Sequence, residues 1–150
     1  MLKTNYYNDF TMDHIAILDK KRKLLPKIIS GEKKIESRWY QTRRTPYNNI
    51  KTGDTVYFKD SGEFVTVKAT VDKTLFFADL TEHKIREILK KYAKDIAISP
   101  EYSEKYSKYK YITLIFLKNV EEIRPFDIDK SGFGNACAWL TLPDIKKIRK

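Results

Sequence analysis

An α+β fold is predicted for this chain of 150 residues: a small, partly open β-barrel with helices covering its ends. We expect about five to six mixed or antiparallel strands. Phe64–Val71 alternates with period two, whereas Thr81–Lys94 has helical periodicity. Four or more short strands with few helices favour a small barrel.

Three strands are expected in the first half of the chain. His14–Leu18 is a short apolar run, and Thr55–Lys59 is a second. Between them, Lys34–Tyr40 places Ile35 and Trp39 on one face and polar residues on the other. This alternation is typical of a strand with one buried face.

A helix is expected between the first two strands, because Leu24, Leu25, Ile28 and Ile29 recur at helical spacing. We place its start at Pro26, since proline is tolerated only in the first turn. Gly31 is suited to end the helix in a left-handed conformation.

The second half contains further strands. Val65, Val67, Ala69 and Val71 share one face of the alternating segment. Tyr111–Leu117 is apolar on both faces, as in a central strand. The last strand is expected at 136–142, followed by a short basic helix over 143–150.

Two helices are expected between these strands. In Thr81–Lys94 the apolar residues follow helical spacing, and Asp79 with Glu82 can form a capping box. A second helix is expected to start at Ser99-Pro100-Glu101. Its tyrosines, spaced along one face, would pack against the protein: Tyr102, Tyr106 and Tyr109.

The chain is interpreted as a polar tail, residues 1–11, followed by a single domain, residues 12–150. The single cysteine, Cys137, favours a reducing, cytoplasmic location. The longest apolar run is far shorter than the roughly 20 residues of a membrane helix, so we expect no membrane association. Cys137, His14 and His83 lack metal-site spacing, so no metal or cofactor is expected.

Positive charge is concentrated in one part of this basic chain. The formal net charge is +10, and between Asp19 and Lys51 eleven Lys and Arg face three acids. Such a cluster favours a polyanionic partner, RNA or single-stranded nucleic acid first. Trp39 and Tyr40 lie within it and can stack on unpaired bases. The alternative is a solvated basic surface with Trp39 in the core.

The segment Gly31–Arg38 combines a helix-ending glycine, a lysine, an apolar residue and a Glu-x-Arg pair. Together with Gly53-Asp54 ahead of an apolar strand, it resembles the signature of the ASCH family of the PUA-like superfamily. The resemblance extends over about 14–117 and includes the strand at 65–71 and the helix after Leu80-Thr81. It implies a PUA-like barrel with a cleft lined by the Gly-Lys-Glu-Arg segment.

The resemblance also implies an RNA- or nucleotide-binding protein in RNA metabolism, whose partner is RNA or a modified nucleotide. We expect a monomer by default. Phosphate contacts are expected from Lys33, Lys34, Arg43 and Arg44, and base recognition from Glu36, Arg38 and Trp39. The simpler alternative is a surface ion pair between Glu36 and Arg38, worth at most about 1 kcal/mol.

A hydrolase is the contrasting function, because some ASCH proteins are similar to amidohydrolases that deacetylate acetylated cytidine. That pattern has a threonine nucleophile three residues after the lysine, where this chain has Glu36 after Lys33. The later carboxylate of the pattern would come from Glu82 or Glu87. A modified-nucleoside amidohydrolase or a ribonuclease would then use Glu36 as a base and Lys33 as the cationic group. A protein-interaction domain is the third alternative.

Overall fold

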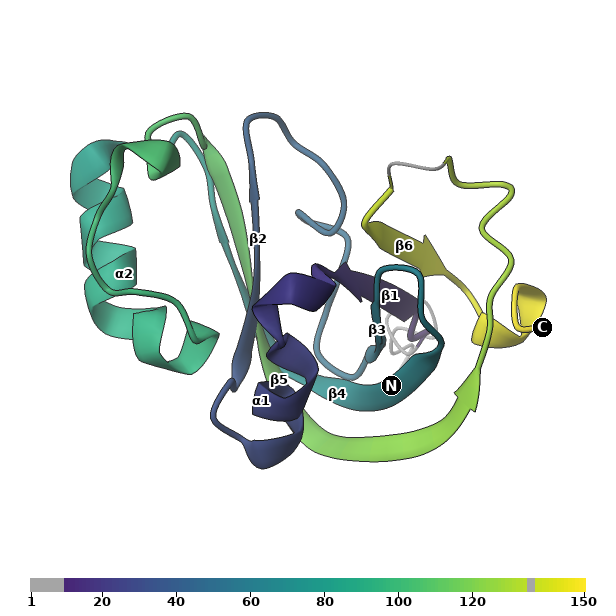
Figure 1. Ribbon diagram of the computed structural model, residues 1–150. Coiled ribbons are helices and arrows are strands. Elements are labelled where there is room, and N and C mark those ends of the chain that lie inside the picture. The colour runs from purple at the N-terminus through teal and green to yellow at the C-terminus, as the bar shows by residue number, and fades with distance from the viewer. Residues whose placement is uncertain (1–9, 135–136) are drawn as a thin grey trace, which may run out of the picture.

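The computed structural model describes residues 10–134 and 137–150, and six strands in this part of the chain form one curled sheet (Figure 1). The strand order is β2-β5-β4-β3-β1-β6. The α+β prediction of a small half-open barrel is confirmed. The strands are β1 Asp13–Leu18, β2 Ile35–Tyr40, β3 Thr55–Asp60, β4 Val65–Phe77, β5 Tyr111–Phe126 and β6 Trp139–Leu142.

The sheet curls because its two longest strands bend. β1 and β3 are parallel, and the other neighbouring strands are antiparallel. The register between β4 and β5 shifts at three places, between Val65 and Lys73. Such irregularities bend a strand and increase its twist. One half of the β4–β5 pair therefore carries β2, and the other half turns under β3 and β1 (Figure 1).

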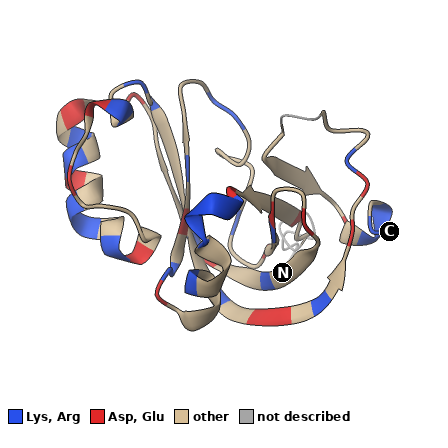
Figure 2. Cartoon of the chain, in the orientation of Figure 1, with Lys and Arg blue, Asp and Glu red and all other residues tan. Residues whose placement is uncertain are grey.

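Helix α1, Leu24–Ser30, covers the inside of the half-barrel. It starts two residues before the predicted Pro26, because Lys23 adopts a left-handed φ of 52° that separates α1 from the 3₁₀ turn η1, Lys20–Arg22. Pro26 still lies in the first turn, where its missing N–H costs nothing. Gly31 ends the helix with a φ of 82°, as predicted. Figure 2 shows that η1 is entirely basic.

Apolar side chains fill both faces of the sheet. Val65, Val67, Ala69 and Val71 are fully buried, which confirms the predicted alternation in β4. On the inside, Val67, Ala69 and Val71 pack with residues of α1 and β1. On the outside, α2, Glu82–Ile96, packs against β2 and β5 (Figure 1). The edge strand β2 is thus held between a helix and the barrel interior.

The ends of α2 differ from the prediction. Its N-cap is Thr81, whose hydroxyl accepts from the N–H of Lys84 at 3.2 Å. Asp79 lies outside the helix, with a left-handed φ of 52°, so the expected capping box with Glu82 does not form. Thr81 can cap because its extended backbone points the hydroxyl at the first turn.

The helix expected from Ser99 is also wrong. The described segment contains only a 3₁₀ turn there, η2, Glu104–Tyr106. Serine and tyrosine, which dominate this stretch, are weak helix formers. Its tyrosines pack without a helix, because Tyr102 and Tyr109 join the cluster around buried Tyr106.

The C-terminal segment is less regular than predicted. Residues 135 and 136, at the start of the expected strand, lie outside the described residues, and β6 begins at Trp139. The expected basic helix is only a 3₁₀ turn, Ile145–Lys147. Of the predicted tail, residues 1–9 lie outside the described residues, and the next two are exposed. No helix in the described part of the chain is long and apolar enough to cross a membrane.

A buried polar network joins β1 to β6 and to the turn before β3. His14 is fully buried; its Nε2 lies 2.7 Å from Asp54 Oδ2, and its Nδ1 accepts from Trp139 Nε1 at 3.2 Å. Because indole is only a donor, the proton of His14 lies on Nε2. Burial alone raises the pKa of Asp54, but hydrogen bonds from His14 and from the N–H groups of Met12 and Lys51 lower it.

Replacing Asp54 by alanine should destabilise the fold by about 3 kcal/mol, because three donors lose a buried acceptor. Urea denaturation measures the change. The matched control is Asp72→Ala, at an exposed aspartate in β4 that pairs with Lys118, and its effect should stay below about 1 kcal/mol. Equal decreases in the free energy of unfolding of the two variants would contradict a structural role for the buried network.

Candidate nucleic-acid interface

Strand β2 presents different residues to its two sides. Glu36 pairs with Ile115 and Arg38 with Thr113, so both charged side chains lie on the inner face of the half-barrel. Trp39 pairs with Ile112 and faces α2. Lys34, expected on the face of Glu36 and Arg38, precedes the strand and is exposed.

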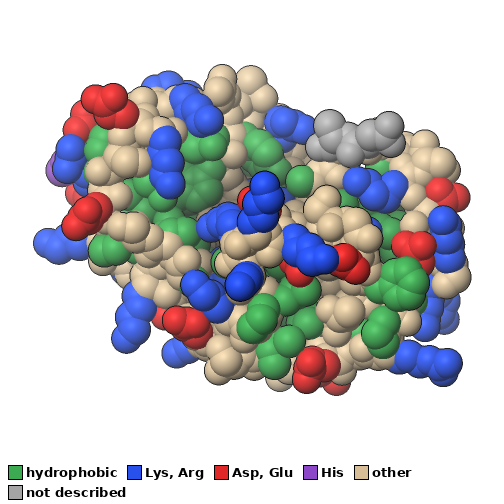
Figure 3. Space-filling view, viewed as in Figure 1, with side chains coloured by type: hydrophobic (Ala, Val, Ile, Leu, Met, Phe, Trp, Pro, Cys, Tyr) green, Lys and Arg blue, Asp and Glu red, His purple; other side chains and the backbone are tan. Residues whose placement is uncertain are grey.

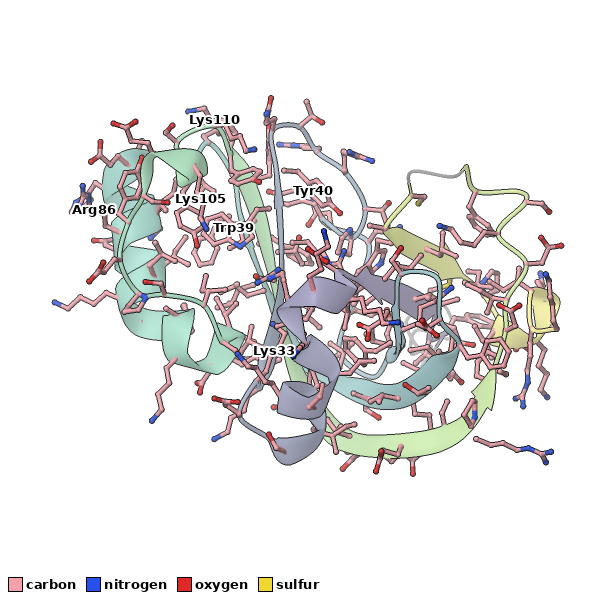
Figure 4. The ribbon with its side chains drawn as sticks, viewed as in Figure 1. Lys33, Trp39, Tyr40, Arg86, Lys105 and Lys110 are labelled. Atoms are coloured by element: carbon pink, nitrogen blue, oxygen red, sulfur yellow. The ribbon has the colours of Figure 1, made fainter. Side chains whose placement is uncertain are left out.

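Lys33 is buried, which corrects the expectation that it contacts a phosphate directly. Only 2% of the residue is exposed, and its Nζ donates to the carbonyls of Ile35 and Ile96, both at 2.8 Å. Nζ also lies 3.2 Å from Glu36 Oε1. Burial lowers the pKa of Lys33, and the charge of Glu36 opposes that shift. Figure 4 shows this side chain beside α1 and β2.

Glu36 is a buried, ionised carboxylate. Its Oε1 accepts from the N–H of Ser37 at 3.0 Å, and its Oε2 accepts from Arg38 Nη2 at 2.9 Å. Burial alone would raise the pKa of Glu36, but the charges of Lys33 and Arg38 lower it to about 2. The pair is therefore more than a surface ion pair, because both partners are largely buried and Lys33 adds a second cation.

Arg38 bridges the open side of the half-barrel. Its Nη2 donates to the carbonyl of Ile17 at 3.3 Å, and its Nη1 donates to that of Ala138 at 3.2 Å. The guanidinium lies 5.1 Å from the ring centroid of Trp139. Its Nε has no hydrogen-bond partner among the described residues. Arg38 thus joins β2 to β1 at a place where strand pairing does not.

A hollow of about 360 Å³ follows this gap, and we call it the β2 groove. Glu36 and Arg38 are on its inner side, and Arg22 of η1 lies at its rim. The groove is lined by Ile17, Leu18, Asp19, Arg22, Leu24, Glu36, Ser37, Arg38, Trp39, Tyr40, Tyr109 and Ala138.

A second hollow of about 480 Å³ lies on the α2 side of β2, and we call it the aromatic pocket. Trp39 lies 4.9 Å from Tyr106 and 5.9 Å from Tyr109, measured between ring centroids. Figure 4 shows Trp39 and Lys105 together on this side, with Tyr40 on the other side of β2. The pocket is lined by Arg22, Ser37, Trp39, Ala97, Ile98, Ser99, Lys105, Tyr106 and Tyr109.

The structure brings together only part of the predicted site. Glu36, Arg38 and Trp39 line the groove, whereas Arg43 and Arg44 lie beyond it, exposed and stacked on tyrosines. Trp39 both packs in the core and lines the hollows, so the two sequence interpretations of this residue are not exclusive. Blue side chains gather over η1 in the middle of the face shown in Figure 3.

Several residues that line the two hollows were missed by sequence reasoning. Arg22 had a signal, because it belongs to the basic run at 20–23. Tyr109 and Lys105 were assigned to a helix and not to a site, since their position depends on how the segment after α2 folds back toward β2. Ala138 contributes a carbonyl group, which residue type does not reveal.

Comparison with solved structures gives the fold. An ASCH crystal structure from Zymomonas mobilis superposes with a TM-score of 0.61 and 17% identity, covering 87% of each chain. The chain has an ASCH domain fold. Two variants of the same Zymomonas protein match at a TM-score of 0.60, with 16% and 17% identity and 87% of this chain covered. They cover 89% and 87% of their own chains.

No protein-family model and no curated protein matches the chain. The ASCH fold nevertheless confirms the resemblance that the Gly31–Arg38 segment suggested, at the level of architecture. In this chain the segment forms the turn into β2, and its last three residues line the groove.

The folded chain should lose stability in acid through Glu36. Because the folded pKa of Glu36 is about 2 and its ordinary value is 4.5, its ionised form stabilises the fold above pH 4.5. That contribution disappears as the pH falls from 4.5 toward 2. The free energy of unfolding, measured with urea across this range, should therefore fall more steeply in the wild type than in Glu36→Gln.

The control for this titration is Glu121→Gln, at an exposed glutamate of β5 paired with Lys68. Its free energy of unfolding should follow the wild-type curve. At neutral pH, Glu36→Gln should cost about 3–5 kcal/mol, because the ammonium of Lys33 is left buried beside a neutral amide. Parallel curves for the wild type and Glu36→Gln would contradict the buried ionised carboxylate.

Proposed function

We propose that this ASCH-fold chain binds single-stranded RNA or a nucleotide in the β2 groove. The observation that carries the proposal is the fixed guanidinium of Arg38 on the groove wall, held by the ionised Glu36 and by two carbonyls. A guanidinium held in one orientation recognises a phosphate or a base carbonyl with little loss of entropy. Three of its five N–H donors contact the protein and the Nε–H is buried, which leaves one Nη1–H for a ligand.

The roles that we assign to the charged residues follow from their exposure to solvent. Exposed Arg22, on the groove rim, is placed to meet a phosphate, and exposed Lys34, Arg43 and Arg44 add positive charge outside the groove. Buried Lys33 acts through Glu36, and Glu36 acts mainly through Arg38. In this proposal, direct base recognition therefore belongs to Arg38 and Trp39, with Glu36 as their support.

Binding is favoured over hydrolysis by the state of the two candidate catalytic groups. Glu36, with a pKa of about 2, is a weak base at neutral pH. The ammonium of Lys33 already contacts two carbonyls and Glu36, so it is not placed to stabilise an oxyanion in the groove. The expected monomeric state and cytoplasmic location, the latter based on the single cysteine, remain part of the proposal.

Affinity for a short single-stranded RNA should fall steeply as salt is added, because phosphate contacts release counterions. Arg22→Ala should weaken binding and reduce the slope of log affinity against log salt by about 1. The matched control is Arg124→Ala, at an exposed arginine of β5 outside both hollows, and it should leave the slope unchanged. Fluorescence anisotropy at several salt concentrations gives both quantities.

The RNA recovered from these titrations should be intact. Cleavage that disappears in Glu36→Gln would instead support the hydrolase alternative. Absence of binding at low salt would contradict RNA binding. If a free nucleotide also failed to bind, the proposed function would be contradicted and a protein-interaction domain favoured. Equal losses of affinity in Arg22→Ala and Arg124→Ala would show that binding depends on the overall positive charge and not on the groove.

A further inference from the structure

The aromatic pocket adjoins the β2 groove but has different chemistry. The two hollows share Arg22, Ser37, Trp39 and Tyr109, so they are continuous around the edge strand β2. The groove contains the buried ion pair, whereas the pocket wall holds the packed rings of Trp39, Tyr106 and Tyr109. We propose that the aromatic pocket receives one unpaired nucleobase, while the phosphate attached to that nucleotide lies against Arg22. This inference rests on the proposed function and assigns the ligand of its second compartment.

Stacking is the interaction that the pocket offers. The Trp39 ring is tilted by 46° to Tyr106 and by 55° to Tyr109, so the three rings form an angled wall and do not stack face to face with one another. Trp39 and Tyr109 are half-buried, which leaves ring surface for a ligand, and Tyr106 is buried behind them. Each base has two π faces and is suited to such a wall.

The polar groups around the rings match a nucleotide better than a purely apolar ligand. Arg22 lies between the two hollows, and Lys105 lies on the pocket wall, with its Nζ 5.2 Å from the Tyr106 ring centroid. The hydroxyls of Ser37 and Ser99 also line the pocket and can meet the polar edge of a base. Each hydroxyl already accepts one N–H, Ser37 from Trp39 and Ser99 from Glu101, so the hydroxyl proton is the group that it offers to a base.

The ligand has to be unpaired. A volume of about 480 Å³ accommodates a single ring system, whereas the bases of a duplex are stacked on neighbours and paired at their edges. A base reaches the aromatic wall only if it leaves such a stack. A strand of RNA and a free nucleotide share this chemistry, and the experiment below distinguishes them.

The test compares a short oligoribonucleotide with an abasic strand of the same length and backbone charge. Binding is followed by anisotropy and by tryptophan emission, with Trp39→Phe identifying the signal of Trp39. The oligoribonucleotide should quench Trp39 emission. Its affinity should exceed that of the abasic strand by at least about tenfold, because stacking of one base contributes a factor of this size. A nucleoside monophosphate that quenches Trp39 at a similar concentration would assign the pocket to free nucleotides, and a response to the oligonucleotide alone would assign it to RNA.

The variant that tests the pocket is Tyr109→Ala, and its matched control is Tyr102→Ala. Both tyrosines belong to the segment after α2 and both pack near Tyr106, but only Tyr109 lines the pocket. Tyr109→Ala should lose about tenfold in affinity for the oligoribonucleotide and none for the abasic strand. Tyr102→Ala should bind both strands like the wild type.

The outcomes separate this inference from the proposed function. If the wild type bound the two strands with equal affinity and Trp39 emission did not change, the proposed base pocket would be overturned. The proposed function would still hold if that binding depended on salt. Failure of both strands and of the nucleoside monophosphate to bind at low salt would overturn both proposals. Equal losses of affinity in Tyr109→Ala and Tyr102→Ala would show that both substitutions act through the folding of the segment, and would contradict base binding in the pocket.

Discussion

The charged side chains of Lys33, Glu36 and Arg38 form one buried chain of contacts that joins separate parts of the fold. Lys33 binds the last carbonyl of α2, Glu36 lies between the two cations on β2, and Arg38 reaches the carbonyls of Ile17 and Ala138. The positive charge at the C-terminus of α2 is also favourable for the helix dipole. Helix, edge strand and the opposite side of the half-barrel are thereby fixed relative to one another.

This arrangement has a cost that explains why the three residues occur together. A single buried charge is strongly unfavourable, and a buried pair is favourable only when its remaining hydrogen bonds are satisfied. Here two carbonyls accept from Lys33, and the N–H of Ser37 donates to Glu36. The carboxylate thereby satisfies one backbone N–H of the edge strand β2, which would otherwise be open to pairing with another strand. The guanidinium of Arg38 is in turn held in one orientation on the wall of the β2 groove.

Sequence patterns predicted most of the fold because those elements depend on local periodicity. The row from Val65 to Val71 and the glycine that ends α1 are examples. The burial of Lys33 could not be predicted, because its partner carbonyl at Ile96 is distant in the sequence. For the same reason, the contribution of Tyr109 to both hollows emerged only from the way the segment after α2 folds back. A resemblance to a family signature pointed to the segment Gly31–Arg38, and tertiary contacts determined which of its side chains are buried and which line the hollows.

The most direct test of the central claim observes the Arg38 side chain itself. Its Nε–Hε resonance can be followed by NMR while a short single-stranded RNA is added, with exposed Arg124 as the internal reference. The account predicts a large, saturable shift of the Arg38 resonance and little change at Arg124. An Arg38 resonance that stays unchanged while the RNA saturates the protein would contradict the claim that the buried charge chain orients this guanidinium for the ligand.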